Sequence, residues 1–422
     1  MARRVLVGLM SVTLLAAFLS ACVPQNPHNV PVDHIVVLMQ ENRSADTYLG
    51  QLNAFGQPAY PAEPTTGNPD PLNPMGPAIV PFHKTTYCET SDLNHSWNGT
   101  HQEWNNGAMD GFTAANATGS ANADPADPSG ARSMGYYNQT DLPFYYGLYN
   151  TFATNDHYFS SVLTQTFPNR SYLYAGTSFG HIANDFSGST QKTVFELLDQ
   201  GSATWKIYAD QYPLSYGSLL FKYVNDRAAQ HVFPMSQYYS DAAAGTLPNV
   251  TFVDSKLVDR PRVETDEHPV SNVQVGQKFV ADVTNALMNS TNWSTSAMFL
   301  TYDEHGGFYD HVAPPPAPVP DNIPPNLQPG DTPGAFDRYG IRVPVVVISP
   351  FAKSHYVSHV IDDHTSILRF IELRFGLPAL TNRDVNADPM LDMFDFSTPH
   401  FASPPVLPTA VVDPGQLAAC PA

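Results

Sequence analysis

The stretch Ala297-Met-Phe-Leu-Thr-Tyr302, followed at once by Asp303-Glu-His-Gly-Gly307, decides the fold class that this sequence predicts. Its first part is a short apolar run before turn residues, a pattern typical of a strand buried on both faces of a sheet. The same pattern occurs earlier, where His34-Ile-Val-Val-Leu-Met39 is followed by Gln40-Glu-Asn42. Two buried strands that end in acidic and amide side chains predict chemistry at the carboxyl edge of a parallel sheet.

Three more apolar runs have the length and β-branched content of buried parallel strands, at residues 205–208, 250–253 and 343–348. Apolar residues at helical spacing lie over residues 279–288 and 366–375. Strands that alternate with helices predict an α/β fold with a mostly parallel central sheet and helices on both faces.

Two segments are too rich in proline to form helices or inner strands. Eight prolines lie from Pro58 to Pro81 and nine from Pro314 to Pro333. Because proline lacks an N–H group and restricts its predecessor, both segments are expected to be surface loops. The strand pattern at 343–348 follows the second segment closely, so we expect one catalytic domain over residues 32–400 and a proline-rich tail over 401–422.

The N-terminus has the features of an export signal. Arg3 and Arg4 precede an apolar stretch, and Leu19-Ser-Ala-Cys22 places small residues before a cysteine, which resembles a bacterial lipoprotein signal. This interpretation makes residues 1–21 a signal peptide, Cys22 the lipidated first residue and 22–31 a tether. The alternative is an ordinary signal peptide with an incidental cysteine. Either way we expect an exported protein, secreted or held at the cell envelope as a lipoprotein whose lipid anchor contacts the membrane.

Charge and cysteine content narrow the function classes. The 422 residues include 20 Lys and Arg against 39 Asp and Glu, a formal net charge of −19, which argues against a nucleic-acid partner. Hydrophobic residues make up 42%, enough for a large core. In an oxidising compartment, Cys88 and Cys420 are either a disulfide pair or two free thiols.

The polar residues at the two strand ends have the chemistry of a metal site. Glu41, Asn42, Asp303 and Glu304 supply carboxylate and amide oxygens, which suit Mg²⁺, Mn²⁺ or Ca²⁺, and zinc also accepts carboxylates. Their position at the ends of two strands predicts that they converge on one divalent ion, although single acidic residues of this kind are more often solvated.

A nucleophile and its anion-binding partners are found in Thr166-Phe-Pro-Asn-Arg170. Thr166 offers a hydroxyl shortly before a predicted helix over residues 171–175, whose N-terminal amides could hold an anion. Arg170 adds a forked donor. Nearby, Gly176-Thr-Ser-Phe-Gly180 matches the nucleophile elbow of serine esterases, with Ser178 as the alternative nucleophile.

Several histidines have acidic neighbours in the sequence. These are His95, His268, His305 and His311. Acidic neighbours raise the pKa of an imidazole, which suits donation to phosphate oxygens or to a leaving group.

Six ordered motifs together resemble a bacterial phosphoesterase family that contains phospholipases C and acid phosphatases, in the alkaline-phosphatase-like superfamily. The motifs are residues 32–50, Gly107-Ala-Met-Asp-Gly-Phe112, Thr166-Phe-Pro-Asn-Arg170, Asp266-Glu-His-Pro269, residues 301–312 and Asp363-His-Thr-Ser-Ile-Leu368. The resemblance runs from about residue 32 to about residue 377. It implies an alkaline-phosphatase-like α/β fold and a hydrolase of phosphate esters, with a phospholipid headgroup or a soluble monoester as substrate.

The resemblance also implies roles for individual residues. It gives one metal ion bound by five residues: Glu41, Asn42, Thr166, Asp303 and Glu304. It makes Thr166 the nucleophile and His95 and His268 the groups that contact phosphate or protonate the leaving oxygen. Arg170 and His311 are expected at the substrate. The remaining alternative is an envelope binding lipoprotein that has kept the fold and lost catalysis, which would predict a missing ligand or nucleophile.

Overall fold

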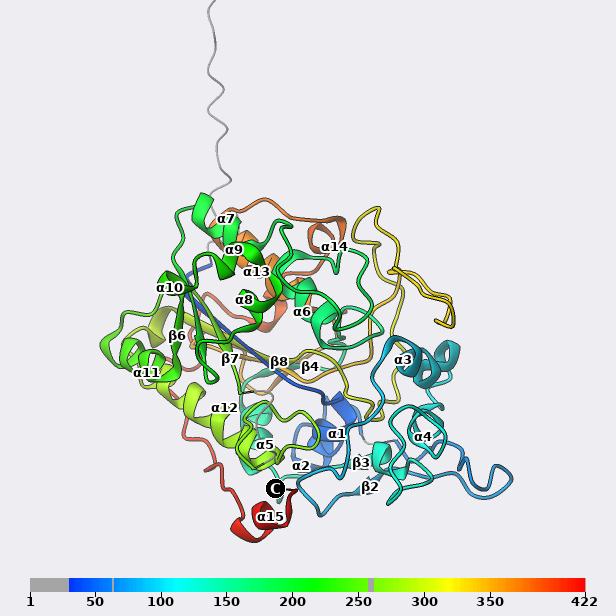
Figure 1. The fold of residues 1–422 in the computed structure, drawn as a ribbon. Helices are drawn as coiled ribbons and strands as arrows, with labels where there is room; N and C mark the ends of the chain where they lie inside the picture. Colours follow the sequence, from blue (N-terminus) through cyan, green and yellow to red (C-terminus); the bar gives the residue numbers. More distant parts are fainter. Residues whose placement is uncertain (1–29, 63, 257–261, 422) are drawn as a thin grey trace, which may run out of the picture.

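The computed structural model describes residues 30–62, 64–256 and 262–421, and within them one eight-stranded sheet forms the centre of the fold (Figure 1). The strand order is β10-β4-β9-β8-β1-β7-β5-β6. The strands are β1 (His34–Gln40), β4 (Ala153–Asn155), β5 (Trp205–Ala209), β6 (Val232–Pro234), β7 (Val250–Asp254), β8 (Ser296–Tyr302), β9 (Val345–Ile348) and β10 (Tyr356–Ser358). The predicted signal peptide, Cys22 and most of the predicted tether lie outside the described residues.

All five predicted strands are present, but the prediction that residues 343–348 form a parallel strand is wrong. The strand β9 runs antiparallel to both of its neighbours, β8 and β4, whereas the other pairs in the sheet are parallel. A parallel return to a neighbouring strand usually carries a helix, and the chain between β8 and β9 forms loops instead. Since β9 is buried on both faces, its composition matches that of a parallel strand.

Helices cover both faces of this sheet, as predicted (Figure 1). One layer contains α6 (Thr166–Ala175), α7 (Val194–Gln200), α8 (Tyr216–Leu220), α9 (Lys222–Asn225) and α13 (His364–Phe375). The other contains α5 (Pro143–Thr151), α11 (Met235–Ala244) and α12 (Val273–Met288). The mostly parallel α/β architecture is therefore confirmed.

The helix α12 shows how the pattern produces these layers. Asn272 caps its first turn, because the side-chain oxygen accepts from the amides of Gln274 at 2.9 Å and Val275 at 3.3 Å. Val280, Val283 and Leu287 are buried, as their spacing requires. On the opposite side Lys278 and Asp282, one turn apart, form an exposed ion pair. The helix is thus fixed by its cap and by one apolar face.

Short helices and strands occupy the connections between the main elements. They are α1 (Ala45–Leu49), α2 (Leu52–Phe55), β2 (Phe82–His83), α3 (Trp97–Trp104), α4 (Phe112–Asn116), β3 (Gly135–Tyr136), α10 (Ala228–His231), α14 (Asn382–Val385) and α15 (Pro414–Ala419). Four 3₁₀ turns accompany them: η1 (Asn105–Gly107), η2 (Ala131–Met134), η3 (Trp293–Thr295) and η4 (Leu391–Met393). Both proline-rich segments are loops, as predicted. Within the described ranges, we find no helix with the length and apolar character needed to cross a bilayer.

A disulfide joins Cys88 to Cys420 across 332 positions of sequence. Of the two possibilities that the sequence allowed, the structure thus has the bonded pair. The bridge ties the segment after α15 to the loop before α3, and Arg262 reinforces it by donating to the Cys420 carbonyl at 2.7 Å. Disulfides are typical of exported proteins.

Candidate active site

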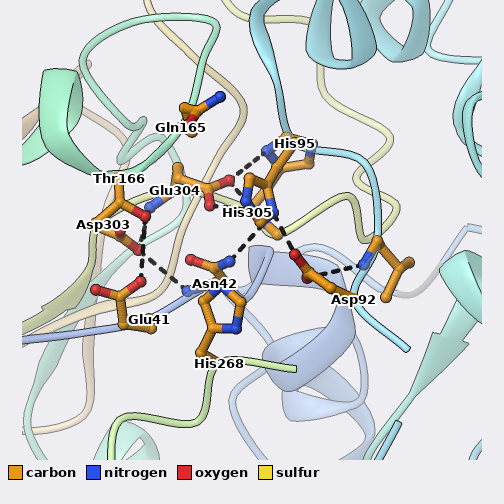
Figure 2. Close-up of polar contacts among 12 residues, drawn as sticks. Glu41, Asn42, Asp92, His95, Gln165, Thr166, His268, Asp303, Glu304 and His305 are labelled. Carbon is orange, nitrogen blue, oxygen red and sulfur yellow. Dashed lines mark hydrogen bonds and ion pairs between the residues drawn. The ribbon is translucent and has the colours of Figure 1, made fainter. Parts of the chain in front are cut away.

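The four predicted oxygen ligands converge where β1 and β8 end (Figure 2). The two strands are parallel neighbours with Gln40 opposite Tyr302, so the residues that follow each strand meet at one edge. Glu41, Asn42, Asp303 and Glu304 are almost completely buried there. The backbone amide of Asn42 donates to Asp303 Oδ1 at 3.1 Å, which links the two strand ends directly.

The backbone at this edge is built for close approach. Asn42 has φ 58°, a left-handed conformation that asparagine adopts more readily than most residues. Gly306 has φ 66°, and a Cβ atom at this position would lie 2.5 Å from the Asn42 carbonyl oxygen. Only glycine allows the turn after Glu304 to pack so closely against Asn42. This turn also holds the side chain of Glu304, because the Gly306 backbone amide donates to Glu304 Oε2 at 2.7 Å.

Three oxygen atoms in this group are buried and have no hydrogen-bond partner among the described residues. They are Asn42 Oδ1, Asp303 Oδ2 and Glu304 Oε1. An unpaired buried oxygen is costly, and three in one cluster indicate that another group satisfies them. Carboxylate and amide oxygens are the ligands that hard divalent cations prefer. The donor set therefore fits one such ion.

The charges of the cluster support the same conclusion. Burial, followed by the nearby charges of Glu41 and Glu304, raises the pKa of Asp303 well above its usual range. Burial and Glu41 likewise raise the pKa of Asp266, whose backbone oxygen accepts from the Glu41 amide at 2.9 Å. Several carboxylates that repel one another in a dry site would be stabilised by a cation between them.

Thr166 lies beside this cluster as the first residue of α6. The helix begins earlier than the predicted stretch 171–175, and Pro168 is tolerated because it falls within the first turn, where amides lack partners inside the helix. The Thr166 hydroxyl donates to Glu41 Oε2 at 3.3 Å, and the residue is 4% exposed. The positive end of the α6 dipole thus lies next to a hydroxyl and four oxygen ligands.

Arg170, one turn further along α6, holds Glu41 in place. Its Nε and Nη2 atoms donate to Glu41 Oε1 at 3.2 and 2.8 Å, and Nη2 also donates to the Met39 carbonyl at 2.9 Å. The guanidinium stacks on Tyr216 at 3.6 Å from the ring centroid, and the Tyr216 hydroxyl also donates to Glu41. Arg170 is fully buried. These contacts hold Glu41, a predicted metal ligand, and the predicted contact of Arg170 with substrate stays a prediction.

The two predicted histidines face each other on the other side of the cluster (Figure 2). The rings of His95 and His268 lie 5.6 Å apart, edge to face, and polar atoms of both are close to the Asp92 carboxylate. Asn42 Nδ2 contacts His95 Nδ1 at 3.2 Å, and Glu304 Oε1 is 3.7 Å from the same atom. Burial lowers the pKa of His268, but the charges of Asp92 and Glu41 outweigh it and leave the pKa raised.

His305 belongs to the cluster through a partner that the sequence analysis missed, Glu103 on α3. His305 Nε2 lies 2.7 Å from Glu103 Oε2 and Nδ1 lies 3.3 Å from Glu304 Oε2, with both carboxylates buried. Burial opposes the charged imidazole, but Glu103 and Glu304 together raise the pKa of His305 to about 9. The imidazolium therefore orients Glu304. No local signal marks Glu103, which comes from a distant helix.

A second missed residue, Asp254, stands at the end of β7. It accepts from the Tyr216 amide at 2.8 Å, and burial raises its pKa to about 6. Asp254 is an acidic residue at the end of a buried strand, which is the same signal that indicated Glu41 and Asp303.

His311 lies in a different set of ion pairs. Its Nδ1 atom contacts Asp46 Oδ2 at 2.7 Å, and Arg342 joins the same group by contacting Asp46 at 2.9 Å and Asp310 at 2.9 Å. The structure thus accounts for His311 by this network, and its predicted contact with substrate stays a prediction.

Comparison with known proteins places the site in a family. The Phosphoesterase family model matches residues 32–378. The chain belongs to the Phosphoesterase family. The predicted resemblance is confirmed, and with it the expectation of an enzyme that hydrolyses phosphoric esters.

Relatives of this phosphoesterase include three proteins named as phospholipases C. The phospholipase C B of Mycobacterium tuberculosis is 32% identical, with 90% of this chain and 81% of the relative aligned. The non-hemolytic phospholipase C of Burkholderia pseudomallei is 33% identical over 87% of this chain and 59% of its own. The non-specific phospholipase C1 of Arabidopsis thaliana is 31% identical, with 85% of this chain and 70% of the relative aligned. A solved alkaline phosphatase superfamily protein from Vibrio parahaemolyticus is 9% identical, with TM-score 0.39 over 84% of this chain and 69% of that chain.

The alternative nucleophile of the phosphoesterase, Ser178, lacks the setting of an esterase elbow. The elbow requires a strand before the serine and a helix after it, but Gly176 ends the helix α6 and residues 177–182 form turns. Ser178 is fully buried, and no described histidine ring contacts its hydroxyl. The local geometry thus offers no base for an attacking serine.

Proposed function

We propose that this phosphoesterase is a metal-dependent phosphodiesterase of the phospholipase C type that uses Thr166 as its nucleophile. The observation that carries the proposal is the contact of the Thr166 hydroxyl with Glu41 beside three buried, unpaired ligand oxygens. A nucleophile and a cation site in contact are what phosphoryl transfer needs.

Glu41, Asn42, Asp303 and Glu304 would hold the ion, with Thr166 as the remaining oxygen ligand. When bound, a divalent ion would favour the deprotonated hydroxyl and neutralise charge on the phosphoryl oxygens. The choice among Mg²⁺, Mn²⁺, Ca²⁺ and Zn²⁺ stays open, because oxygen ligands suit all four. No ligand or nucleophile is missing, which argues against the inactive binding lipoprotein.

The places of the side chains support the following reaction. Thr166 Oγ1 would attack phosphorus and displace the alcohol of the ester, and water would then hydrolyse the phosphothreonine. The backbone amide of Thr166, at the start of α6, would stabilise a phosphoryl oxygen, whereas the Phe167 amide already donates to Asn184 Oδ1 at 2.7 Å. His268, whose raised pKa favours the imidazolium, and His95 beside it would donate a proton to the departing oxygen.

A cavity adjoins the chain segments that carry Thr166 and His95. A cavity of about 290 Å³ is lined by Gln165, which precedes Thr166, and by Ser96, which follows His95. Trp97, Ile182 and Asn326 also line it. A pocket of this size, lined by the chain neighbours of Thr166 and His95, offers room for the group on one side of a phosphodiester and supports a diester over a small monoester.

The place of action is proposed on three grounds. The lipobox-like sequence ending at Cys22 supports an exported lipoprotein, the disulfide is typical of an oxidising compartment, and the relatives are named phospholipases C. We infer that the enzyme acts at the cell envelope and that a lipid anchor on Cys22 places it next to phospholipid.

The test compares hydrolysis of p-nitrophenyl phosphorylcholine and p-nitrophenyl phosphate by the wild type and by Thr166→Ala, before and after chelation. We expect the diester to be preferred, chelation to abolish activity, and Thr166→Ala to lower kcat by roughly 1,000-fold or more. Ser178→Ala is the matched hydroxyl control and should retain activity. Activity in Thr166→Ala that is lost in Ser178→Ala would refute the threonine mechanism.

A further inference from the structure

A second cluster of ligand-type side chains lies on the same edge of the sheet, outside the candidate active site. It consists of Asp156, His157 and His359, whose ligand atoms all lie within 4.8 Å of one another. Asp156 directly follows β4 and His359 directly follows β10. The two strands are parallel neighbours with Asn155 opposite Ser358, so the next residues in each, Asp156 and His359, stand side by side.

Two imidazoles meet one buried carboxylate in this cluster. His157 Nδ1 lies 2.6 Å from Asp156 Oδ1, and His359 Nδ1 lies 2.9 Å from both carboxylate oxygens. The Asp156 side chain is 4% exposed, and no lysine or arginine side chain in the described ranges contacts its carboxylate. A buried carboxylate normally has a cation partner, and in the described ranges the two imidazoles are the basic side chains that contact this one.

The positions of these groups are fixed by their backbone. The Asp156 amide donates to the Ser358 carbonyl at 3.1 Å, and the Asp156 carbonyl accepts from Arg342 Nη1 at 2.8 Å. The His157 amide donates to Asn155 Oδ1 at 2.6 Å. Ligands carried on fixed strand ends lose little conformational entropy when they bind an ion.

The outer side of the cluster is open to solvent. The side chains of His157 and His359 are 39% and 59% exposed, whereas the carboxylate beneath them is buried. An ion could therefore enter from water and keep water as its remaining ligand, and the net charge of −19 favours the approach of cations.

We propose that Asp156, His157 and His359 form a second metal site, selective for Zn²⁺ or a similar transition-metal ion. Two imidazole nitrogens and one carboxylate oxygen are a zinc ligand set, while Mg²⁺ and Ca²⁺ prefer oxygen ligands. The Nδ1 atoms release their protons when they bind the ion, and each ring keeps a proton on Nε2. The ion clamps the edge strand β10 to β4.

The site is separate from the candidate active site. The strand β9 lies between β4 and β8, so Asp156 is two strands away from Asp303, about 10 Å across the sheet. The two sites share no ligand, and each can be removed without the other. The proposal therefore does not depend on the proposed catalytic mechanism.

The test counts ions in the full-length protein, stripped of metal and dialysed against Zn²⁺, by mass spectrometry. We expect His359→Ala to bind one zinc fewer than the wild type and Glu41→Gln to keep the ion that depends on His359. His400→Ala is the matched control, since His400 faces only one carboxylate, Asp395, at 3.5 Å. It should bind as many ions as the wild type.

Cobalt gives an independent reading of the ligand geometry. Titration with Co²⁺ should produce visible absorption bands of a four- or five-coordinate site in the wild type and in Glu41→Gln, and these bands should be absent in His359→Ala. Saturating Zn²⁺ should raise the Tm of Glu41→Gln by about 3 °C and leave that of the double variant Glu41→Gln/His359→Ala unchanged. Equal zinc content in the wild type and His359→Ala, or identical cobalt spectra, would overturn the proposal.

Discussion

Arg170 donates two hydrogen bonds to a single oxygen of Glu41, Oε1, and leaves Oε2 of the same carboxylate to the hydroxyl of Thr166. One oxygen thus anchors Glu41 and the other faces the reacting group. The fork of the guanidinium makes this division possible, because both of its donors converge on one acceptor. A change at Arg170 can therefore perturb the site while all proposed ligands stay in place.

Arg170→Lys should weaken the site while it keeps the positive charge. Lysine is a point charge and cannot supply both donors to Glu41 and the bond to the Met39 carbonyl. We expect the affinity for the activating divalent ion to fall by roughly 10- to 100-fold, measured as the ion concentration that restores half of the activity after chelation. Lys278→Arg, on the exposed face of α12, is the control and should leave this concentration unchanged.

Glu103→Gln should change the charge of His305. Without the Glu103 carboxylate, the strongest opponent of burial is lost and the pKa of His305 falls from about 9. We expect kcat/KM at pH 8 to fall by roughly 10- to 100-fold, because a neutral ring orients Glu304 less well. The ¹⁵N chemical shifts of the His305 ring should titrate at a lower pH in the variant. An unchanged titration would contradict the assigned ion pair.

Gly306→Ala should disturb the contact between the two strand ends. A Cβ atom there would meet the Asn42 carbonyl at 2.5 Å, and the residue has φ 66°. The matched control is Gly188→Ala, where φ is 62° and no atom lies within 4 Å. Both variants should lose about 1 kcal/mol of stability from backbone strain, and Gly306→Ala a further 1–3 kcal/mol from crowding. Chemical denaturation measures both, and the activity of Gly306→Ala alone should fall.

The pH dependence of stability should report on Glu372 in α13. Burial, and then the nearby Asp384, raise its pKa from 4.5 to about 10. The carboxyl group is therefore neutral in the folded chain at pH values where it ionises in the unfolded chain. Its contribution to stability is full below about pH 4.5 and is lost progressively as the pH rises toward 10.

Glu372→Gln keeps the shape of this side chain and removes its ionisation. The variant should be more stable than the wild type at pH 8, by about 1 kcal/mol or more, and its Tm should vary less between pH 5 and pH 9. Thermal unfolding in a series of buffers measures this. Parallel Tm curves for the two proteins would show that Glu372 is ionised in the fold.

The sequence predicted the central strands because β1, β5, β7 and β8 are apolar runs of five to seven residues. It missed β4, β6 and β10, which have three residues each and therefore too little pattern to stand out. The direction of β9 was predicted wrongly because burial on both faces leaves the same composition in either direction.

The candidate site was predictable to the extent that its residues follow strand ends or recognisable motifs. Glu41, Asn42, Asp303 and Glu304 do so, and they converge as expected. Glu103 and Tyr216 reach the site from helices far away in sequence, where their neighbours carry no chemical signal. Such supporting contacts are set by tertiary packing, which a single sequence does not display.

The bridge between Cys88 and Cys420 can form only after the C-terminal end of the chain has been synthesised. Thr166, His268 and Asp303 all lie inside the closed loop, whereas Glu41 precedes it. Cys88 is synthesised early, and its partner follows 332 positions later in the chain. Until then its thiol is available to alkylating reagents, and afterwards it is not. In a pulse–chase experiment, the time at which Cys88 becomes protected from alkylation would therefore report when the bond to Cys420 has formed.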